Sequence, residues 1–285
     1  MKILLTGPNS FCGKFILRQF INKGHDVTVI SRNKASQNFG NNVQCIYGDL
    51  SSIKQIEGSF DVVVHIAATA PPVSTTYPLI QDNILATQNL INLVKNLSIQ
   101  KFIFFSTCSV YGEVNQPILN ESTPIYKPHV YGTSKLMCEA MLREQKWFQS
   151  ITIRLPAVMG NGAARHWLAS TIHKAKAGET ITLNNPDALF NNAIYVNELA
   201  VFVETLLHTK LHHDFDCINV ASKDGLPIIN IVEKIIKKFN SSSVISIEDN
   251  QKTSFVISSQ YAIDNYAFKP LAFKEALNYY LEDIT

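Results

Sequence analysis

The sequence predicts an α/β fold in which helices cover both faces of a doubly wound parallel sheet. Short apolar, β-branched segments alternate with longer segments of helical periodicity, which is typical of strands joined by crossover helices. The segments VVVHIA and KFIFFS are continuously apolar and do not alternate with polar residues, which indicates strands buried on both faces. The chain of 285 residues is also long enough to bury a substantial core.

The elements of the first half follow from this alternation. The predicted strands are residues 2–6, 26–30, 43–47, 62–67, 101–106 and 151–155, and the predicted helices are residues 11–23, 83–97 and 131–147. Since each predicted strand is separated from the next by a helix or a long connection, the strands are expected to be parallel.

A less regular region begins after the strand that ends at residue 155, where Gly160-Asn161-Gly162 and many Asn and Pro residues interrupt the pattern. It is predicted to contain helices at 166–177, 196–207, 228–239 and 273–281, with short strands at 180–183 and 217–220. We therefore divide the chain into a first domain, 1–158, and a smaller region, 159–285, some of whose elements return to the first core.

Composition excludes several classes of protein. The net charge of +2 is too small to indicate a nucleic-acid or acidic-membrane partner. No segment approaches ~18 uninterrupted apolar residues, so no membrane span is expected. The five cysteines are scattered and odd in number, which predicts neither a disulfide framework nor a zinc site and fits a reducing cytoplasm.

The segment TGPNSFCG joins the first predicted strand to the first helix. Gly7 and Gly13 occupy the first and third glycine positions of a phosphate-binding turn, and Ser10 stands at the second, where the backbone closely approaches a pyrophosphate. Its hydroxyl could donate to a phosphate oxygen or its side chain could crowd the ligand. The turn alone fits an ordinary strand-to-helix connection equally well, but with the motifs below it predicts a dinucleotide-binding domain of the Rossmann type over residues 1–158.

Three further residues bear on the cofactor. Ser31 and Arg32 end the second strand, where NAD-binding proteins place a carboxylate and NADP-binding proteins often place an Arg, so NADP(H) is favoured and NAD(H) stays possible. Asp49 follows the third strand, where its carboxylate could meet the adenine amino group.

Tyr131 and Lys135 form the most informative pair. Their i, i+4 spacing places both side chains on one face of a helix, and no other tyrosine of the chain has a lysine four residues on. A nearby ammonium stabilises phenolate, so we expect Lys135 to lower the pKa of Tyr131 and make the phenol a proton donor and acceptor.

These motifs occur in an order that resembles the extended short-chain dehydrogenase/reductases, often called NAD-dependent epimerase/dehydratases. The resemblance covers nearly the whole chain, through TGPNSFCG, GDL, DVVVHIAA, DNILATQNL, FFSTCSVYG, YGTSK, RLPAVMG, AIYVNELA and AFKPLAFKEAL. It implies that Thr107 is the hydroxyl partner of Tyr131, and that the chain forms a homodimer. The cofactor contacts that we expect are Gly7, Asn9, Ser10, Phe11, Gly13, Ser31, Arg32, Asp49, Leu50, Ile66, Ala67, Asn83, Tyr131, Lys135 and Pro156.

The resemblance implies an NAD(P)-dependent oxidoreductase that reduces a keto group of a nucleotide-activated sugar, with Tyr131 as the proton donor. An NAD-dependent sugar-nucleotide epimerase would use the same residues and is the alternative. A second alternative is a non-catalytic dinucleotide-binding regulator, against which the intact Thr107, Tyr131 and Lys135 argue. Dehydratases of the family carry an acidic pair where this chain has Cys108 and Ser109, so dehydration is not expected.

Two positions depart from the family pattern on the substrate side. Ala157 replaces an Asn that often contacts the sugar nucleotide, and Asn191-Asn192 stands where an Arg commonly holds the diphosphate. Cations of the preceding helix could replace that Arg or could simply be solvated: they are Arg165, Lys174 and Lys176.

The histidines near the end of one predicted helix suggest a metal only weakly. His208 and His212 are four residues apart and His213 follows, but the segment runs into a polar loop, and zinc requires a closed set of ligands. We therefore expect no metal site.

Overall fold

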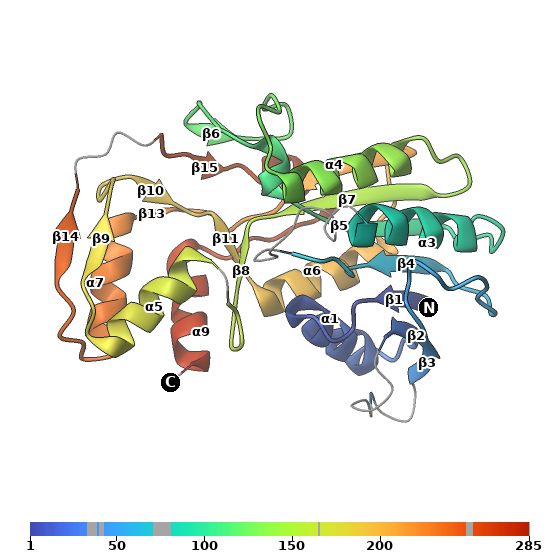
Figure 1. Cartoon of the computed structure of the whole chain (residues 1–285), viewed down its shortest axis with the longest axis horizontal. Coiled ribbons are helices and arrows are strands. Elements are labelled where there is room, and N and C mark those ends of the chain that lie inside the picture. Colours follow the sequence, from blue (N-terminus) through green and yellow to red (C-terminus); the bar gives the residue numbers. More distant parts are fainter. Residues whose placement is uncertain (33–38, 40–42, 71–80, 165, 249–252, 285) are drawn as a thin grey trace.

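The computed structural model describes residues 1–32, 39, 43–70, 81–164, 166–248 and 253–284. Seven parallel strands form its central sheet, in the order β12-β7-β5-β4-β1-β2-β3 (Figure 1). Their bounds are β1 (Lys2–Thr6), β2 (Asp26–Ser31), β3 (Val43–Tyr47), β4 (Val62–His65), β5 (Lys101–Thr107), β7 (Gln149–Leu155) and β12 (Phe215–Asn219). The predicted α/β fold of the Rossmann type is confirmed.

The order in which strands are added to the sheet reverses at β1. From β1 the chain first builds outward through β2 and β3, then returns to the other side of β1 and builds through β4, β5, β7 and β12. In open parallel sheets such a reversal leaves a crevice at the carboxyl ends of the strands, where ligands bind. The crevice here lies between β1 and β4, which pair with Thr6 opposite His65.

Helices cover both faces of the sheet. On one face, α1 (Phe11–Asn22) and α6 (Val196–His208) bury their apolar stripes against the sheet and against each other. On the other, α3 (Ala86–Val94) and α4 (Val130–Arg143) bury theirs. Strands β4 and β5, which carry the continuous apolar segments, are buried along their whole length, whereas the edge strand β3 is only partly buried.

A second hydrophobic core lies beyond the end of β7 (Figure 1). It is built from α5 (Trp167–Ala177), α7 (Ile228–Lys238) and α9 (Phe273–Asp283), with the parallel pair β9 (Ile181–Leu183) and β14 (Ile245–Ile247). A second parallel pair, β8 (Ala157–Met159) with β11 (Ala193–Tyr195), connects this core to the sheet side of the molecule.

The structure differs from the predicted elements in a few places. The predicted helix 83–97 is a π-helical turn, Gln81–Leu85, followed by α3, and the helix predicted to end at 147 ends at Arg143. Helix α8 (Gln260–Tyr266) was not predicted. Neither were the two- and three-residue strands β6 (Ile118–Leu119), β8, β10 (Leu189–Phe190), β11, β13 (Leu226–Pro227), β14 and β15 (Val256–Ile257), which are too short to show a period.

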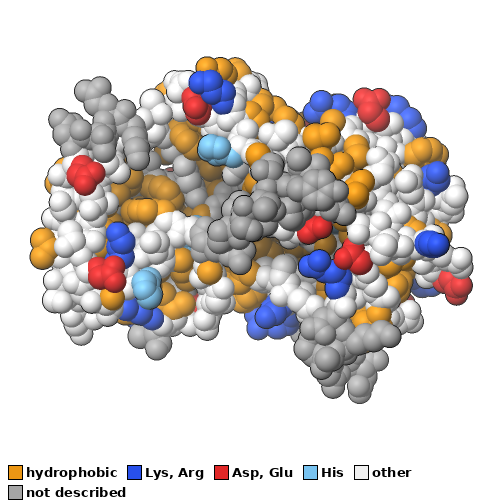
Figure 2. Space-filling view, in the orientation of Figure 1, with side chains coloured by type: hydrophobic (Ala, Val, Ile, Leu, Met, Phe, Trp, Pro, Cys, Tyr) orange, Lys and Arg blue, Asp and Glu red, His pale blue; other side chains and the backbone are white. Residues whose placement is uncertain are grey.

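Three further observations concern the surface, the cysteines and the length of the helices. On the face seen in Figure 2, acidic and basic side chains are interspersed and do not gather into a patch of one sign. All five cysteines are free thiols. Within the described ranges, no helix combines the length and apolar character needed to cross a bilayer.

Candidate cofactor and catalytic site

The turn after β1 has the tight geometry that its two glycines permit. Gly7 has a φ of 70°, and a Cβ added there would lie 2.7 Å from the Ala67 nitrogen. A Cβ at Gly13 would lie 2.0 Å from the Gly7 carbonyl oxygen. Both positions therefore require glycine, because any side chain would force apart the turn, the end of β4 and the start of α1.

Ser10 closes the turn as the N-cap of α1. Its hydroxyl donates to the Gly7 carbonyl oxygen at 2.8 Å and accepts from the Gly13 N–H at 3.1 Å. The sequence suggested that this hydroxyl donates to a phosphate, whereas here its proton is already used within the turn. Among the described contacts, the N–H groups of Phe11 and Cys12 have no partner, so they are the donors left at the positive end of the helix for a phosphate.

A cavity of about 650 Å³ opens above this turn, at the switch point of the sheet. The segments that end β1, β2, β3 and β4 all contribute to its walls, together with the start of the α3 region. The residues that line it are Thr6, Gly7, Pro8, Asn9, Ser10, Lys14, Ile30, Ser31, Arg32, Gly48, Asp49, Leu50, Ala67, Ala68, Thr69, Asp82 and Ala86. This volume, with oriented N–H groups at one end, fits a dinucleotide.

Eight of the predicted cofactor contacts line this cavity, and the others lie around it. Phe11 lies beside Gly160 of the loop that follows β8, within reach of the second half of the chain. Ile66 is buried next to the lining residue Ala67, and Pro156 joins β7 to β8. Lys14 and Asp82 line the cavity but were not predicted, since nothing in their local sequence distinguishes them from ordinary helix-surface charges.

The far end of the cavity carries an exposed ion pair. Arg32 lies 3.8 Å from Asp49 through one guanidinium nitrogen, and 72% of its side chain is accessible. Hydrogen bonds from the Ser51 hydroxyl and N–H hold the pKa of Asp49 below its ordinary value, so the carboxylate is charged at neutral pH. Asn9 donates to the Ser31 hydroxyl at 3.2 Å. A carboxylate therefore stands beside the cation that was expected to bind a 2′-phosphate.

Thr107 and Tyr131 come from two elements that meet closely. Thr107 ends β5 and caps the 3₁₀ turn Cys108–Tyr111, and Tyr131 lies in the first turn of α4. A Cβ at Gly132 would lie 2.2 Å from the Ser109 carbonyl oxygen, so this glycine lets α4 approach the 3₁₀ turn. The Thr107 hydroxyl accepts from the Ser109 N–H at 3.1 Å and donates to the Ser109 hydroxyl at 3.2 Å.

Lys135 is a buried cation without a carboxylate beside its ammonium. Only 1% of the residue is accessible, and its Nζ lies 4.1 Å from the centre of the Phe104 ring. Burial lowers its pKa to about 8. Within the described part of the chain it makes no hydrogen bond, so its ammonium is available to a hydroxyl group of a ligand.

The expected effect of Lys135 on Tyr131 is corrected by the structure. Burial raises the pKa of Tyr131 to about 12, and the charges that add to this shift are those of Cys12 and Cys138. The lysine does not offset the burial, because its ammonium is directed over Phe104. Tyr131 is thus held in its protonated form, which suits a proton donor.

A polar connection holds α4 in register with the cofactor cavity. The side-chain amide of Asn83 donates to the Ser134 hydroxyl at 3.0 Å and exchanges hydrogen bonds with the backbone of Thr69. Ser134 in turn donates to the Tyr131 carbonyl oxygen. Asn83 was expected to contact the cofactor, and its amide here connects a cavity wall to α4.

A second buried chain of hydrogen bonds runs beneath the cavity. The Ala67 N–H donates to the Thr6 hydroxyl, and this hydroxyl lies 2.7 Å from His65 Nδ1. His65 Nε2 lies 3.0 Å from the Thr87 hydroxyl, which donates to the Asn83 carbonyl oxygen. These directions assign the proton to Nε2. Burial and the charge of Lys135 hold the pKa of His65 well below its ordinary value, so the chain stays neutral.

The two substrate-side departures now have a structural description. Ala157 lies in β8, paired with Ala193. Asn191 is buried, and its amide donates to the carbonyl oxygens of Ser222 and Ile257 and accepts from the Ile257 N–H, each at 2.8 Å. All three contacts are to backbone, so Asn191 fixes loops and is not directed at a ligand.

Three cations were candidates to replace the missing Arg, and contacts fix the direction of one of them, Lys176. Lys176 donates to the Ile284 carbonyl oxygen at 3.1 Å and lies over the Phe239 ring, which directs it toward the C-terminal helix. The proposed role is therefore wrong for Lys176. Lys174 is partly buried in the last turn of α5, and Arg165 lies outside the described residues.

An ion pair behind the catalytic residues was not predicted. Arg154 donates to both carboxylate oxygens of Glu139, at 3.1 and 2.6 Å, and Ser106 donates to one of them at 2.5 Å. Glu139 is wholly inaccessible, and the guanidinium also lies over the Tyr111 ring. A buried charge is costly unless it is paired, so Glu139 and Arg154 need each other. Since Glu139 lies in α4 and Arg154 in β7, their ion pair joins these two elements. The sequence offered one sign that this carboxylate faces the same way as Lys135: Glu139 lies four residues after it, one helical turn on.

Comparisons with known proteins show the family of the chain. Residues 3–220 match the model of the NAD dependent epimerase/dehydratase family. The chain is 25% identical over 244 residues to GDP-6-deoxy-D-talose 4-dehydrogenase of Aggregatibacter actinomycetemcomitans, covering 82% of this chain and 78% of that protein. It is 27% identical over 144 residues to UDP-glucose 4-epimerase of Corynebacterium glutamicum, covering 48% of this chain. That match spans 44% of the relative, so the alignment covers less than half of its length.

Solved structures of this fold superpose over nearly the whole chain. UDP-glucuronic acid 4-epimerase from Bacillus cereus, in complex with NAD, has a TM-score of 0.84 at 20% identity, covering 99% of this chain and 98% of that one. UDP-N-acetylglucosamine 4-epimerase from Methanobrevibacter ruminantium, in complex with UDP-N-acetylmuramic acid, has a TM-score of 0.82 at 25% identity, covering 99% and 97%.

Proposed function

Since the chain belongs to the NAD-dependent epimerase/dehydratase family, we propose that it is an NAD-dependent epimerase of a nucleotide-linked sugar. The observation that carries this proposal is that a partly buried Tyr131 and a buried Lys135 lie one turn apart in α4, and that hydrogen bonds hold α4 to a wall of the dinucleotide-sized cavity. A binding protein without catalysis would not require a desolvated ammonium with no carboxylate partner.

Epimerisation is favoured over the net reduction that the sequence suggested as the main activity. The relatives named above include UDP-sugar 4-epimerases, and the dehydrogenase among them is also a sugar-nucleotide enzyme. The dehydrogenase name, by contrast, describes net oxidation or reduction at one sugar carbon, so it supports the reductase as the alternative. Cys108 and Ser109 supply no carboxylate, and Cys108 donates its thiol to the Arg154 carbonyl oxygen, so the elimination of water lacks its acid and base.

The chemistry then requires few groups of the chain. A bound nicotinamide would supply hydride transfer, taking a hydride from one face of the sugar carbon and returning it to the opposite face, which inverts that carbon. Tyr131 exchanges a proton with the sugar oxygen: it gives one when the hydroxyl is restored and takes one as the carbonyl forms, which requires that the phenol has first lost its own proton. Lys135 offers its ammonium to ligand hydroxyls beside Tyr131. The Thr107 hydroxyl donates a hydrogen bond to the same sugar oxygen once it turns away from Ser109.

The proposal predicts a reaction that consumes no external reductant. Incubated with UDP-linked and GDP-linked hexoses and only catalytic NAD, the protein is expected to convert one of them to its epimer until the two reach equilibrium. The two sugars are separated by ion-pair chromatography. Stoichiometric oxidation of NADPH or NADH with a keto sugar, in the absence of epimer formation, would instead establish the reductase.

Cofactor choice depends on the ion pair at the far end of the cavity. Arg32 alone favours NADP(H), but the Asp49 carboxylate beside it repels a 2′-phosphate and can accept a hydrogen bond from a free ribose hydroxyl. We therefore propose NAD(H), and the preference for NADP(H) predicted from Ser31 and Arg32 is not supported by these contacts.

Replacing Asp49 with Asn tests this assignment. Asn keeps an acceptor for Ser51 but removes the negative charge, so NADPH affinity is expected to rise about fivefold relative to NADH, a modest factor because the site is exposed to solvent. Arg32→Ala, the matched opposite change, is expected to lower NADPH affinity by a similar factor and leave NADH unchanged. Fluorescence titration measures both. Equal effects on the two dinucleotides would show that this pair does not contact the ribose.

A further inference from the structure

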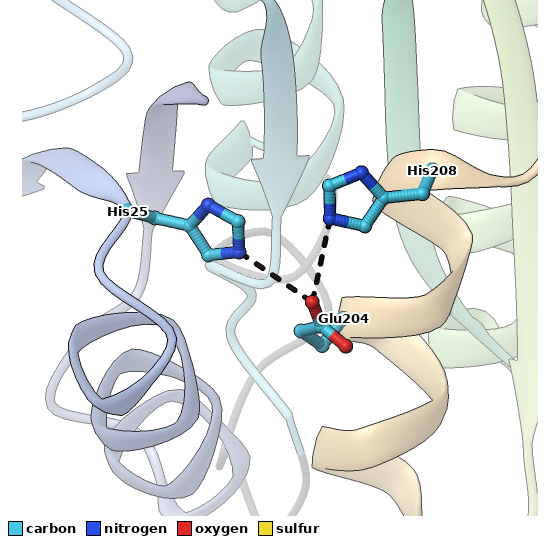
Figure 3. Close-up of side chains that lie close together, drawn as sticks. All are labelled: His25, Glu204 and His208. Atoms are coloured by element: carbon cyan, nitrogen blue, oxygen red, sulfur yellow. Dashed lines mark ion pairs between the residues drawn. The ribbon is translucent and has the colours of Figure 1, made fainter.

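A cluster of three side chains lies at the opposite end of α1 from the cofactor turn. His25 follows α1, and Glu204 and His208 are one turn apart near the end of α6. Glu204 Oε1 lies 3.6 Å from His25 Nε2 and 3.4 Å from His208 Nε2. Figure 3 shows both imidazole rings directed at this one oxygen. None of the three lines the cofactor cavity.

His25 is the unusual member of the cluster. Its side chain is only 6% accessible, and its buried Nε2 has no hydrogen-bond partner, since the carboxylate oxygen is too distant to accept a hydrogen bond. A buried nitrogen without a partner costs free energy unless a ligand satisfies it.

The spacing of the three atoms matches one tetrahedral ion. Zinc binds His nitrogen and carboxylate oxygen at about 2.0 to 2.2 Å, which sets neighbouring ligands roughly 3.3 to 3.6 Å apart on a tetrahedron. Both contacts of Glu204 Oε1 fall within this interval, and all three ligand atoms lie within 4.8 Å of one another. His208 is 57% accessible at the end of its helix, so its ring can make the small movement that closes the set.

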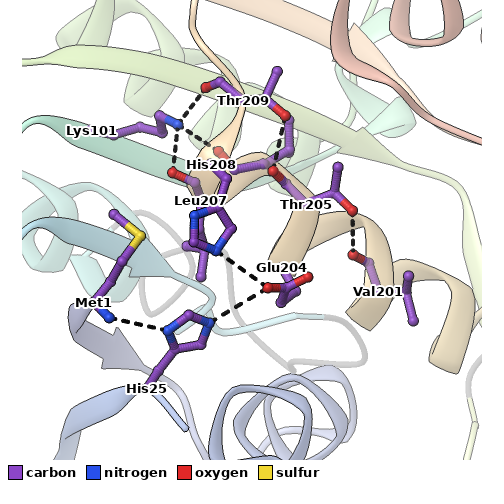
Figure 4. Close-up of polar contacts among 10 residues, drawn as sticks. Met1, His25, Lys101, Val201, Glu204, Thr205, Leu207, His208 and Thr209 are labelled. Carbon is purple, nitrogen blue, oxygen red and sulfur yellow. Dashed lines mark hydrogen bonds and ion pairs between the residues drawn. The ribbon is translucent and has the colours of Figure 1, made fainter. Parts of the chain in front are cut away.

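Both sides of the cluster are firmly mounted. The His25 N–H donates to the Phe20 carbonyl oxygen across the end of α1, where Gly24 adopts a φ of 73°. On the other side, Lys101 extends from β5 and donates to the carbonyl oxygens of Leu206, Leu207 and Thr209, which fixes the end of α6 (Figure 4). The ligands are thus presented by anchored backbone.

We propose that His25, Glu204 and His208 bind one Zn²⁺ ion, with water in the remaining position, and that the ion ties the α1–β2 connection to α6. Two imidazoles and a carboxylate favour zinc over Mg²⁺ or Ca²⁺, which prefer sets of oxygen ligands. The Met1 ammonium donates to His25 Nδ1 at 3.3 Å, so coordination through Nε2, which moves the ring proton to Nδ1, requires this amine to lose a proton.

The cluster also corrects which histidines belong together. The sequence placed His208 with His212 and His213 and predicted no metal. His212 instead lies 3.3 Å from the Asn265 carbonyl oxygen, and the missing ligands come from Glu204, one turn earlier, and from the distant His25. This contact makes His212 a suitable control, because it is an exposed histidine in the same part of the chain outside the cluster.

The test titrates the full-length protein with Zn²⁺ by calorimetry at pH 8, and follows thermal unfolding in parallel. The wild type is expected to bind one ion and to gain a few degrees in Tm at saturation. His208→Gln, at an exposed position, should fold normally, bind zinc at least ~10-fold more weakly and lose the gain in Tm. Glu204→Gln, which keeps the size of the side chain, should do the same, whereas His212→Gln should behave as the wild type.

Co²⁺ substitution separates this site from the cysteines. Binding to His25, Glu204 and His208 gives weak visible bands without the intense near-ultraviolet band of a cobalt–thiolate bond. Such a thiolate band, zinc affinity unchanged in His208→Gln, an equal loss in His212→Gln, or no stoichiometric binding would each overturn the proposal, the last leaving an ordinary histidine–carboxylate cluster. None of these outcomes bears on the epimerase, whose activity is measured separately.

Discussion

Tyr131→Phe is expected to lower turnover ~10²- to 10⁴-fold while dinucleotide binding stays nearly unchanged. The substitution keeps the ring, which is partly buried at the start of α4, and removes only the hydroxyl that carries the transferred proton. Turnover is measured by chromatography on the nucleotide sugar that the wild type accepts, and binding by fluorescence titration. Turnover at the wild-type rate would show that the proton comes from another group.

Two companion variants separate the roles around Tyr131. Thr107→Val removes a hydroxyl that already has partners in Ser109, so its effect on turnover should be milder. Lys135→Met should lower both turnover and cofactor affinity. It should leave the Tm unchanged or raised, because a buried ammonium without a carboxylate partner is replaced by an apolar side chain of similar size. A marked drop in Tm would show that Lys135 supports the fold.

Gly13→Ala is expected to weaken dinucleotide binding at least ~100-fold, about 2.7 kcal/mol. The added Cβ would lie 2.0 Å from the Gly7 carbonyl oxygen, so the start of α1 must move away from the turn and take its free N–H groups with it. Binding is measured for NADH by fluorescence, with circular dichroism to confirm that the chain is folded.

Ser10→Gly is the matched control for the turn. It removes an N-cap but introduces no atom, so dinucleotide affinity should change by less than about tenfold. If Gly13→Ala bound NADH as tightly as the wild type, the phosphates would lie elsewhere. If both variants lost binding equally, the Ser10 hydroxyl would contact the ligand, as the sequence first suggested.

The sequence predicted the sheet half of the fold well because its signals there are local. The strands around β1 and β5 are continuous apolar segments, and α6, α7 and α9 have clear amphipathic periods, so their bounds fall within one or two residues of those observed. The short pairs of the second half, such as β8 with β11, are held by distant partners and show no period of their own. The π-helical turn before α3 likewise shows no period of its own in the sequence.

Site prediction stopped where spatial neighbours matter. The glycines of the turn and the pair of Tyr131 and Lys135 are visible as spacings. The direction of the Lys135 ammonium, and therefore the raised pKa of Tyr131, depends on Phe104 of another strand. In the sequence Asn191 showed only that an expected Arg is missing, and its three backbone contacts could not be seen there. The homodimer and the cytoplasmic location stay predictions.

The pairing of α1 with α6 bears on the order in which the chain can fold during synthesis. The apolar stripe of α1, which includes Phe20, is covered by Leu199, Phe202 and Leu206 of a helix that begins only at Val196. A ribosome adding 5–20 residues per second needs on the order of ten seconds or more to make the intervening chain. Throughout that time the nascent chain exposes this stripe, so α1 is the segment that a chaperone would shield and at which an interrupted chain would aggregate.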